Sequence, residues 1–206
     1  MKEYPSITNE IRYDIPIVMF LKLDGSNFRS SWTPKRGFSK FGSRHQLIDE
    51  SNLIGKKAIP ILKSKYEEWL SIVFRDQKWK EEVLCFFEFH GPNSHFGQHL
   101  ETEDQTLTLI DVNPLRKGIL HPKEFIKLFG GLDIPKILYE GYLTPEIVKQ
   151  VKDSSLPGMD LEGVVCKGSP DKRNPHPAMF KIKSQAWLNK LKLYCQDDST
   201  LFEKLQ

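Results

Sequence analysis

Three lysines in this chain occupy positions that suit chemistry on a phosphate. One could act as a reactive amine, and the other two could bind the phosphate as a pair. Lys22 follows a run of five apolar residues and opens a K-x-D-G motif. A lysine at a strand end can act as a nucleophile if its pKa falls from about 10.4 toward neutrality. Lys181 and Lys183 lie two residues apart, so on a strand they share a face, where they can bind a phosphate and lower the pKa of Lys22. Alone, the motif also fits a surface lysine before an Asp-Gly turn.

Short apolar runs predict the strands that would position these lysines. The runs cover residues 17–21, 83–89, 107–112, 161–167 and 179–183. Helical spacing and capping residues predict helices over residues 61–83, 122–130 and 144–151 and from 184 onward. Because strands and helices mix without strict alternation, the sequence predicts an α+β fold with a largely antiparallel sheet.

The composition excludes several classes of protein. A chain of 206 residues accommodates one large domain or two small ones. It holds no stretch of about 18 uninterrupted apolar residues, and its first residues have no apolar signal-peptide core. Three cysteines, Cys85, Cys166 and Cys195, lie far apart without CxxC spacing. This usage indicates reduced thiols in a cytoplasmic protein.

The distribution of charge says more than the formal net charge of +3. Residues 19–44 hold six basic residues and one acid, whereas residues 101–111 hold four acids and no base. The basic stretch also contains four aromatic residues: Phe28, Trp32, Phe38 and Phe41. Such a stretch can contact a phosphodiester backbone and stack on bases. A solvated loop face is the alternative interpretation.

Four further segments with polar residues follow Lys22 in a fixed order. They are the segments 87–91 with Glu88, 107–112 with Asp111, 161–167 with Glu162, and 180–183 with the lysine pair. Singly, each has an ordinary structural interpretation, as an edge-strand surface residue, a cap or the solvent face of a strand. In this order, from about Val18 to Lys183, they resemble the covalent nucleotidyltransferase superfamily of ATP-dependent ligases and mRNA-capping enzymes.

Within that superfamily the chain resembles the RNA-ligase branch, notably the small ligases that repair nicks in double-stranded RNA. Asn27 just after the K-x-D-G motif is typical of that branch, as are an arginine, Arg44, about twenty residues after Lys22 and Lys167 at the end of the E-G-x-V segment. The resemblance implies a nucleotidyltransferase (ATP-grasp-like adenylation) core with mainly antiparallel sheets flanked by helices. We expect a single domain over residues 1–206, with no appended oligonucleotide-binding barrel or helical domain.

The resemblance also implies an ATP-dependent RNA ligase. It would form lysyl-AMP on Lys22, transfer the AMP to an RNA 5′-phosphate and seal that end to a 3′-hydroxyl. The catalytic residues would be Lys22, Asp24, Glu162, Lys181 and Lys183. The nucleotide-binding residues would be Lys22, Glu88, Ile110, Asp111, Glu162, Lys167, Lys181 and Lys183. Asn27 and Arg44 would contact the RNA 5′-phosphate, and Glu162 would help to place Mg²⁺, for which Mn²⁺ can substitute.

The implied partner is RNA, and the implied protein is a cytoplasmic monomer, in the host cytoplasm if it is viral. Ile110 stands where the family usually has an aromatic residue stacked on adenine, a loss of about 0.5–1.5 kcal/mol of stacking. A nucleotide- or RNA-binding domain without turnover therefore stays open as an alternative. A DNA ligase core and a GTP-dependent capping enzyme are further alternatives, although Asn27 argues against both.

Overall fold

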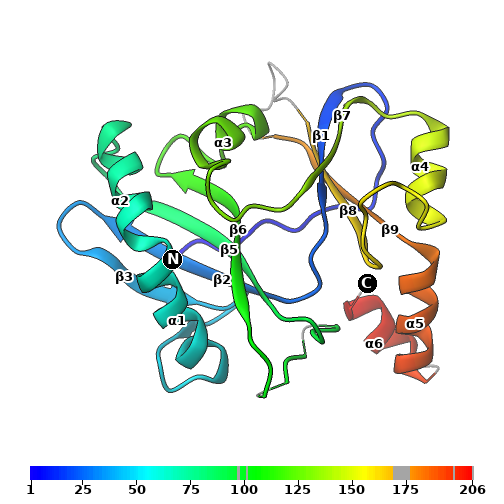
Figure 1. The fold of residues 1–206 in the computed structure, drawn as a ribbon, viewed down its shortest axis with the longest axis horizontal. Helices are drawn as coiled ribbons and strands as arrows, with labels where there is room; N and C mark the ends of the chain where they lie inside the picture. Colours follow the sequence, from blue (N-terminus) through cyan, green and yellow to red (C-terminus); the bar gives the residue numbers. More distant parts are fainter. Residues whose placement is uncertain (97, 101, 169–176, 197, 206) are drawn as a thin grey trace. The chain divides into compact units, whose positions relative to one another are not determined.

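The computed structural model describes every residue except 97, 101, 169–176, 197 and 206. The described chain forms two compact units, each with its own sheet and hydrophobic core (Figure 1). Unit 1 comprises Met1–Pro5 and Asp24–Ile134, and unit 2 comprises Ser6–Leu23 and most of the chain from Pro135 onward. The boundary after Leu23 divides the K-x-D-G motif between the units.

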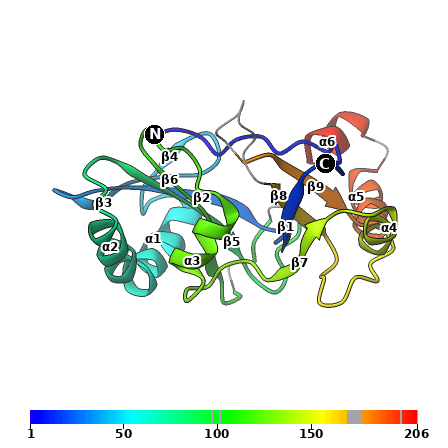
Figure 2. The same ribbon diagram turned by 90° about the horizontal axis from the view of Figure 1, so that it is seen from above.

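Unit 1 contains a five-stranded antiparallel sheet in the order β4-β3-β2-β5-β6. Its strands are β2 (Ser26–Thr33), β3 (Gly37–Gly42), β4 (Leu47–Ile48), β5 (Val83–His90) and β6 (Thr106–Pro114). The helices α1 (Leu53–Lys65), α2 (Glu67–Asp76) and α3 (Pro122–Phe129) all lie on one side of this sheet (Figure 2). The core between sheet and helices buries large aromatic side chains such as Phe28, Tyr66, Phe87 and Phe129.

The other side of this sheet carries the polar residues of the strands. On β5, Phe87 and Phe89 belong to the core, so the alternating residues Phe86 and Glu88 face the opposite side. A bulge on β6 keeps Asp111 on that side, because the pairing shifts from Leu109 opposite Phe87 to Asp111 opposite Phe86. We call this side of the unit 1 sheet, which bears Asn27, Arg29, Phe86, Glu88 and Asp111, the open face.

Unit 2 contains a four-stranded antiparallel sheet in the order β7-β1-β8-β9. Its strands are β1 (Pro16–Leu21), β7 (Ile137–Tyr142), β8 (Gly163–Gly168) and β9 (Met179–Lys183), and its helices are α4 (Pro145–Lys152), α5 (Gln185–Cys195) and α6 (Ser199–Leu205). The core consists of apolar residues from β1, β8, β9 and α4, including Ile17, Met19, Val164, Phe180 and Val151. The two sheets with their helices confirm the predicted α+β class with antiparallel sheets.

The predicted helix starts at residues 144 and 184 are confirmed by their caps. Thr144 Oγ1 accepts a hydrogen bond from Ile147 N (3.3 Å), and Ser184 Oγ accepts one from Trp187 N (3.1 Å). The helix predicted over residues 61–83 is wrong in its bounds. The chain instead forms α1 from Leu53, with Asn52 as its N-cap, and α2, and the two are separated by Tyr66, whose φ of −122° is not helical.

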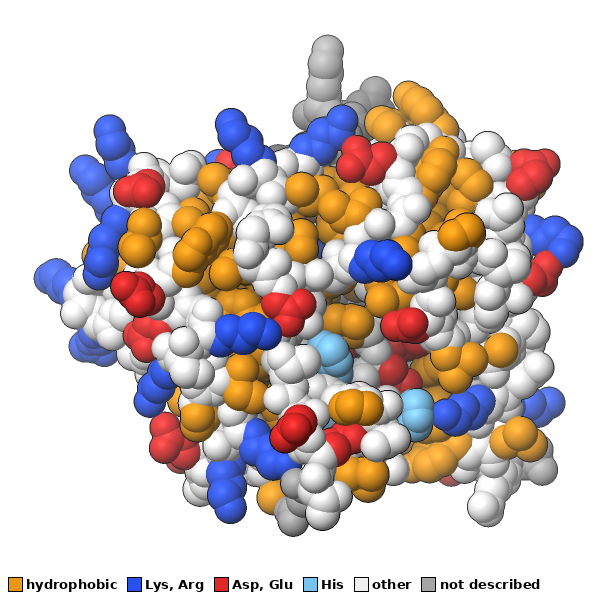
Figure 3. Space-filling model, in the orientation of Figure 1, with side chains coloured by type: hydrophobic (Ala, Val, Ile, Leu, Met, Phe, Trp, Pro, Cys, Tyr) orange, Lys and Arg blue, Asp and Glu red, His pale blue; other side chains and the backbone are white. Residues whose placement is uncertain are grey.

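The structure corrects one part of the prediction for the basic and aromatic stretch, residues 19–44. Phe28, Trp32 and Phe38 are buried in the unit 1 core, so the interpretation that they stack on bases is wrong. Lysine and arginine side chains are interspersed with acidic ones over the face that Figure 3 displays, in keeping with the net charge of +3. Among the described residues, no helix combines the length and the apolar character needed to cross a membrane.

Candidate active site

The unit 2 sheet aligns the nucleophile candidate with the lysine pair. Lys22 directly follows β1, and its backbone N–H donates to the carbonyl of Gly163 on β8 (3.0 Å). Gly163 is in turn paired with Lys183 on β9. Lys22 and Lys183 therefore come from the two strands that flank the start of β8, although they are 161 positions apart in the sequence.

The carboxylate of Glu162 joins these two amines. Its Oε1 atom lies 2.9 Å from Lys22 Nζ and 3.2 Å from Lys183 Nζ. The side chains of Glu162 and Lys183 are 5% and 6% exposed and that of Lys22 is 21% exposed, so both ion pairs are largely shielded from water. Oε2 of Glu162 is buried and has no hydrogen-bond partner among the described residues. One carboxylate oxygen is therefore left for a cation or a proton.

The side-chain amine of Lys183 has a lowered pKa. Burial and, to a smaller extent, the nearby charges of Lys22 and Lys181 lower its pKa to about 8, although Glu162 acts in the opposite direction. Its Nζ also lies 3.5 Å from the centre of the Trp187 ring, where a cation is attracted to the π face. Near neutral pH this amine is mostly protonated, and it loses its charge under mildly alkaline conditions.

Lys167 and Lys181 occupy the same side of the unit 2 sheet as Lys183. Phe180 on β9 belongs to the core, so its neighbour Lys181 points to the other side, as the sequence predicts. Lys167 on β8 is 3% exposed, and its Nζ lies 5.0 Å from the centre of the Phe20 ring. Together with Lys22, these lysines give this side of the sheet a strongly positive character that suits an anion.

Close backbone approaches explain the glycines of two motifs. Gly163 has a φ of +134°, and a Cβ atom there would lie 2.2 Å from the carbonyl oxygen of Ile182. In unit 1, a Cβ atom on Gly25 would lie 2.4 Å from the carbonyl oxygen of Phe89. Only glycine fits both positions without moving the backbone. The glycine after Glu162 and the glycine of K-x-D-G are therefore required by packing.

The unit 1 candidates Asn27, Glu88 and Asp111 share the open face. Asn27 on β2 is paired with Glu88 on β5, which is an inner strand, so Glu88 is not an edge-strand residue. Asp111 is 1% exposed within β6 and is not a cap, and its Oδ2 accepts a hydrogen bond from the hydroxyl of Tyr4. Burial and the Asp111 carboxylate raise the pKa of Tyr4 well above its usual value.

The other predicted unit 1 residues lie at different places. Asp24 Oδ1 accepts a hydrogen bond from Phe96 N (2.8 Å), so this carboxylate holds the segment after β5. Ile110 is half-buried at the β6 bulge, and Arg44 is exposed in the turn between β3 and β4. The role of Arg44 in phosphate binding stays a prediction.

Sequence reasoning did not find a serine–histidine chain in unit 1. His99 Nε2 lies 2.8 Å from Ser26 Oγ, and His99 Nδ1 lies 3.0 Å from Ser94 Oγ. Burial lowers the pKa of His99, which favours a neutral ring between the two hydroxyls. The contact joins residues 73 positions apart, and no spacing rule links them. Among the described residues, no three His, Cys, Asp or Glu side chains form a metal-binding group.

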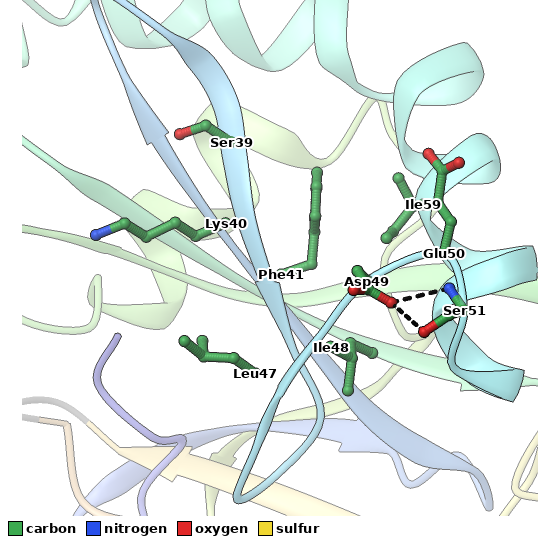
Figure 4. A pocket seen from close by; sticks show the side chains of 9 residues that line it. All are labelled: Ser39, Lys40, Phe41, Leu47, Ile48, Asp49, Glu50, Ser51 and Ile59. Carbon is green, nitrogen blue, oxygen red and sulfur yellow. Dashed lines mark hydrogen bonds between the residues drawn. The ribbon is translucent and has the colours of Figure 1, made fainter.

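A separate open cavity of about 620 Å³ lies in unit 1 (Figure 4). It is lined by residues of β3, β4 and the start of α1: Ser39, Lys40, Phe41, Leu47, Ile48, Asp49, Glu50, Ser51 and Ile59. None of the residues that the sequence predicts to be catalytic or nucleotide-binding lines it. The cavity is therefore distinct from the candidate active-site residues.

The chain has the fold of an RNA ligase nucleotidyltransferase. It is similar to Naegleria gruberi RNA ligase in a complex of a variant with AMP and Mn, with a TM-score of 0.64 over 92% of this chain at 15% identity. Similar values hold for that ligase with PPi (TM-score 0.62, 91% coverage, 18% identity) and for a variant with ATP and Mn (0.61, 91%, 17%). The chain spans 58–59% of the length of these ligases. No family model and no curated protein sequence matches it.

Proposed function

We propose that this protein is an ATP-dependent RNA ligase that forms a lysyl-AMP intermediate on Lys22. The proposal rests chiefly on one observation, the shared Glu162 carboxylate oxygen 2.9 Å from Lys22 Nζ and 3.2 Å from Lys183 Nζ. A largely buried amine beside a carboxylate and a second cation is the arrangement expected of an activated lysine nucleophile. The likeness of the fold to an RNA ligase adds to this support.

In the first step, the unprotonated amine of Lys22 attacks the α-phosphorus of ATP. A P–N bond forms, and the P–O bond to the departing pyrophosphate breaks. The proton of the Lys22 ammonium leaves before the attack, and Glu162 Oε1 is within hydrogen-bond distance to accept it. Lys181 and Lys183 contact the α-phosphate and balance the charge that develops on its oxygens. Asp24 joins this catalytic set as the carboxylate next to the nucleophile.

The remaining candidates bind the nucleotide. Glu88 accepts a hydrogen bond from a ribose hydroxyl, Ile110 packs on the base, and Asp111 and Lys167 supply further polar contacts. Glu162 Oε2, buried and without a hydrogen-bond partner among the described residues, fits a ligand of Mg²⁺ or Mn²⁺. A bound divalent cation would neutralise phosphate charge.

The later steps use RNA. An oxygen of the RNA 5′-phosphate attacks the phosphorus of lysyl-AMP, which breaks the P–N bond and restores the amine of Lys22. The 3′-hydroxyl then attacks the RNA 5′-phosphorus and releases AMP. Asn27 and Arg44 hold the 5′-phosphate in these steps. We further propose that the protein acts as a cytoplasmic monomer built around a single nucleotidyltransferase domain over residues 1–206.

Transfer of label from α-labelled ATP to the protein tests the proposal. With Mg²⁺ present, we expect label on the chain that withstands alkali and is released by acid, as is typical of a phosphoramidate P–N bond. Lys22→Ala should abolish this label, because Lys22 is the proposed nucleophile. Lys152→Ala, which removes an exposed lysine at the end of α4, is the matched control and should keep the label. A nicked RNA duplex, a nicked DNA duplex and single-stranded RNA then identify the substrate that is sealed.

The same experiment separates the alternatives. Label from GTP alone would indicate a capping nucleotidyltransferase, and sealing of nicked DNA but not of RNA would indicate a DNA ligase core. The feature that favours a binding domain without turnover is Ile110, which stands where the RNA ligases usually have an aromatic residue stacked on adenine. If neither nucleotide labels the chain at any pH from about 6 to 9, the enzyme proposal is wrong and that alternative remains.

A further inference from the structure

Arg29 is a buried cation on the open face of unit 1. It is 2% exposed, and it lies on β2 opposite Phe86 of β5. Its Nη1 donates to the carbonyl oxygen of Met1 (3.2 Å), and its Nε is buried and has no hydrogen-bond partner among the described residues. Burial lowers the pKa of Arg29, although Glu3 acts in the opposite direction. The hydrogen-bonding capacity of the guanidinium is therefore only partly used in this structure.

A buried guanidinium normally faces a carboxylate or a phosphate. Its planar fork matches the two oxygens of such an anion, and the paired hydrogen bonds offset the loss of hydration. Among the described residues, the ion pairs include none between Arg29 and a carboxylate, and a single neutral carbonyl is a weak substitute. The arrangement suits a site whose anion is not part of the chain.

The N-terminal arm, Met1–Pro5, covers this site. It runs along the side of the sheet opposite α1, α2 and α3, which is the open face (Figure 2). Besides that of Met1, its contacts include the Tyr4 ring, whose centre is 4.9 Å from that of Phe86, and the Tyr4 hydroxyl, which donates to Asp111. Glu3 Oε2 also lies 3.2 Å from His45 Nδ1. The arm thus lies over Arg29 and over residues that we assign to nucleotide binding.

We propose that Arg29 binds the terminal phosphate monoester of a polynucleotide and that the arm Met1–Pro5 covers it until the polynucleotide binds. This inference rests on the proposed function and adds a phosphate-binding residue and a covering segment to it. Phosphate oxygens engage the edge of the fork formed by Nε and Nη2, and departure of the arm removes the Met1 carbonyl from Nη1. Asn27, two residues earlier on the same side of β2, lies about 7 Å away along the strand, within reach of the same phosphate.

The phosphates of ATP are less suitable occupants. They are assigned to Lys181 and Lys183 of unit 2, whose amines already share one side of a sheet with Lys22. Arg29 belongs to unit 1 and to the row of residues around Asn27, for which a 5′-phosphate contact is proposed. The ligand class is therefore the end of an RNA strand, and ATP binding is an outcome that the test has to distinguish.

Binding of one RNA with and without its 5′-phosphate tests the inference. We expect the full chain to prefer the 5′-phosphorylated strand in fluorescence anisotropy, and Arg29→Gln to reduce that preference about tenfold, the effect of one charged hydrogen bond. Arg75→Gln, an exposed arginine in the last turn of α2, is the matched control and should leave the preference unchanged. If Arg29 has only a structural role, Arg29→Gln should lower the affinity for both RNAs equally, and this result would contradict the inference.

Removal of residues 2–5 tests the covering role. We expect this deletion to raise the affinity for the 5′-phosphorylated strand several-fold in the Arg29 background and to leave it unchanged in the Arg29→Gln background. An equal gain in both backgrounds would show that the arm does not act on Arg29. If Arg29→Gln does not fold, Arg29→Lys can replace it, because lysine keeps the charge but lacks the planar fork. Its preference for the 5′-phosphorylated RNA should be weaker than that of the unaltered chain but should not be lost.

Lysyl-AMP formation separates this inference from the proposed function. Each variant is incubated with α-labelled ATP, and the dissociation constant for ATP is measured in parallel. If the unaltered chain takes up no label, the proposed function fails. If every variant takes up label while the preference for the 5′-phosphate is unchanged by Arg29→Gln, only the inference fails. Weaker ATP binding in Arg29→Gln, without loss of the RNA preference, would assign Arg29 to ATP.

Discussion

At the scale of single residues, the defining feature is one carboxylate shared by two amines. Glu162 lies within 3.2 Å of both Lys22 and Lys183, so the three groups carry a net positive charge when both amines are protonated. Loss of one proton still leaves an ion pair, which keeps the carboxylate satisfied. The group can therefore release a proton from an amine without leaving an unpaired buried charge.

Glu162→Gln removes the carboxylate that both shielded amines, of Lys22 and Lys183, contact. We expect the free energy of unfolding to fall by about 3 kcal/mol, as for other broken buried ion pairs, and lysyl-AMP formation to be lost. Urea unfolding and labelling with ATP measure the two effects. Glu140→Gln, an exposed glutamate on β7, is the control and should change stability by less than about 0.5 kcal/mol. A stable, active Glu162→Gln protein would refute the role of the shared carboxylate.

Lys183→Arg tests the lowered pKa of Lys183. Since Lys183 has a pKa of about 8, the free protein loses this phosphate-binding charge above that pH. We expect the second-order rate of lysyl-AMP formation to decline above pH 8, because this rate reports the ionisation of the free protein. Arginine stays charged, so the decline should move to higher pH in Lys183→Arg. If the rate declines at the same pH in both proteins, the ionisation of another group causes the decline.

At the scale of secondary structure elements, strand alternation and close glycine contacts position the site. Phe180 and Ile182 enter the unit 2 core, which turns Lys181 and Lys183 to the other side of β9. The carbonyl of Ile182 approaches Gly163 so closely that β8 and β9 meet without a side chain between them. The spacing of the lysines to Glu162 depends on this approach.

Gly163→Ala should separate the start of β8 from β9. The φ of +134° and the 2.2 Å approach of Ile182 O both disfavour an alanine, and we expect a loss of about 1–3 kcal/mol in the free energy of unfolding. Gly131→Ala is the control, because the nearest atom to a Cβ there is 3.9 Å away. Thermal unfolding compares the two variants. Equal stability of the two would show that the backbone at Gly163 can move at little cost.

The sequence predicts the elements whose patterns are local. Apolar runs predict β1, β5, β6, β8 and β9, and capping residues predict the starts of α3, α4 and α5. The segment Ser26–Thr33 carries serines and an arginine among its aromatics, so its polar composition conceals strand β2. Without β2, neither the side on which Arg29 lies nor its burial can be inferred. Helices α1 and α2 are merged in the prediction because the apolar spacing continues across Tyr66.

The candidate site is predictable in part for the same reason. Alternation alone predicts that Lys181 and Lys183 share a side, and the order of the motifs predicts the participation of Lys22 and Glu162. The shared oxygen of Glu162 depends on strand register, which no local pattern determines. The contact between Tyr4 and Asp111 joins residues 107 positions apart through a segment without regular structure, so no periodicity can indicate it.

At the scale of the whole molecule, the likeness of fold to an RNA ligase comes with low sequence identity. The likeness to Naegleria gruberi RNA ligase spans 91–92% of this chain at 15–18% identity. Each unit has a core of its own, and cores tolerate substitutions that keep volume and patterning. The polar residues on one side of each sheet are less free to change, because pairing and register determine which groups they meet.

RNA binding by the whole chain should be weak and strongly dependent on salt. The exposed cations of the β2–β4 region are Lys35, Arg36, Lys40 and Arg44. If these contact phosphates of single-stranded RNA, the slope of log K against log salt should be about −3, or −0.7 for each contact. Anisotropy from low to moderate KCl measures the slope, and Lys35→Ala should reduce its size by about 0.7. Lys149→Ala on α4 is the control, and tight binding that hardly changes with salt would contradict the prediction.

The bulge at Ile110 makes the side on which Asp111 lies independent of the identity of the bulged residue. A substitution at Ile110 changes one half-buried side chain and leaves the register from Leu109 to Asp111 intact. Deletion of the same residue would remove the bulge but not exchange the sides, because Leu109 already pairs with Phe87 and Asp111 with Phe86, the next residue of β5. This position can therefore accept aliphatic or aromatic residues, or be lost, while the Asp111 carboxylate stays on the open face.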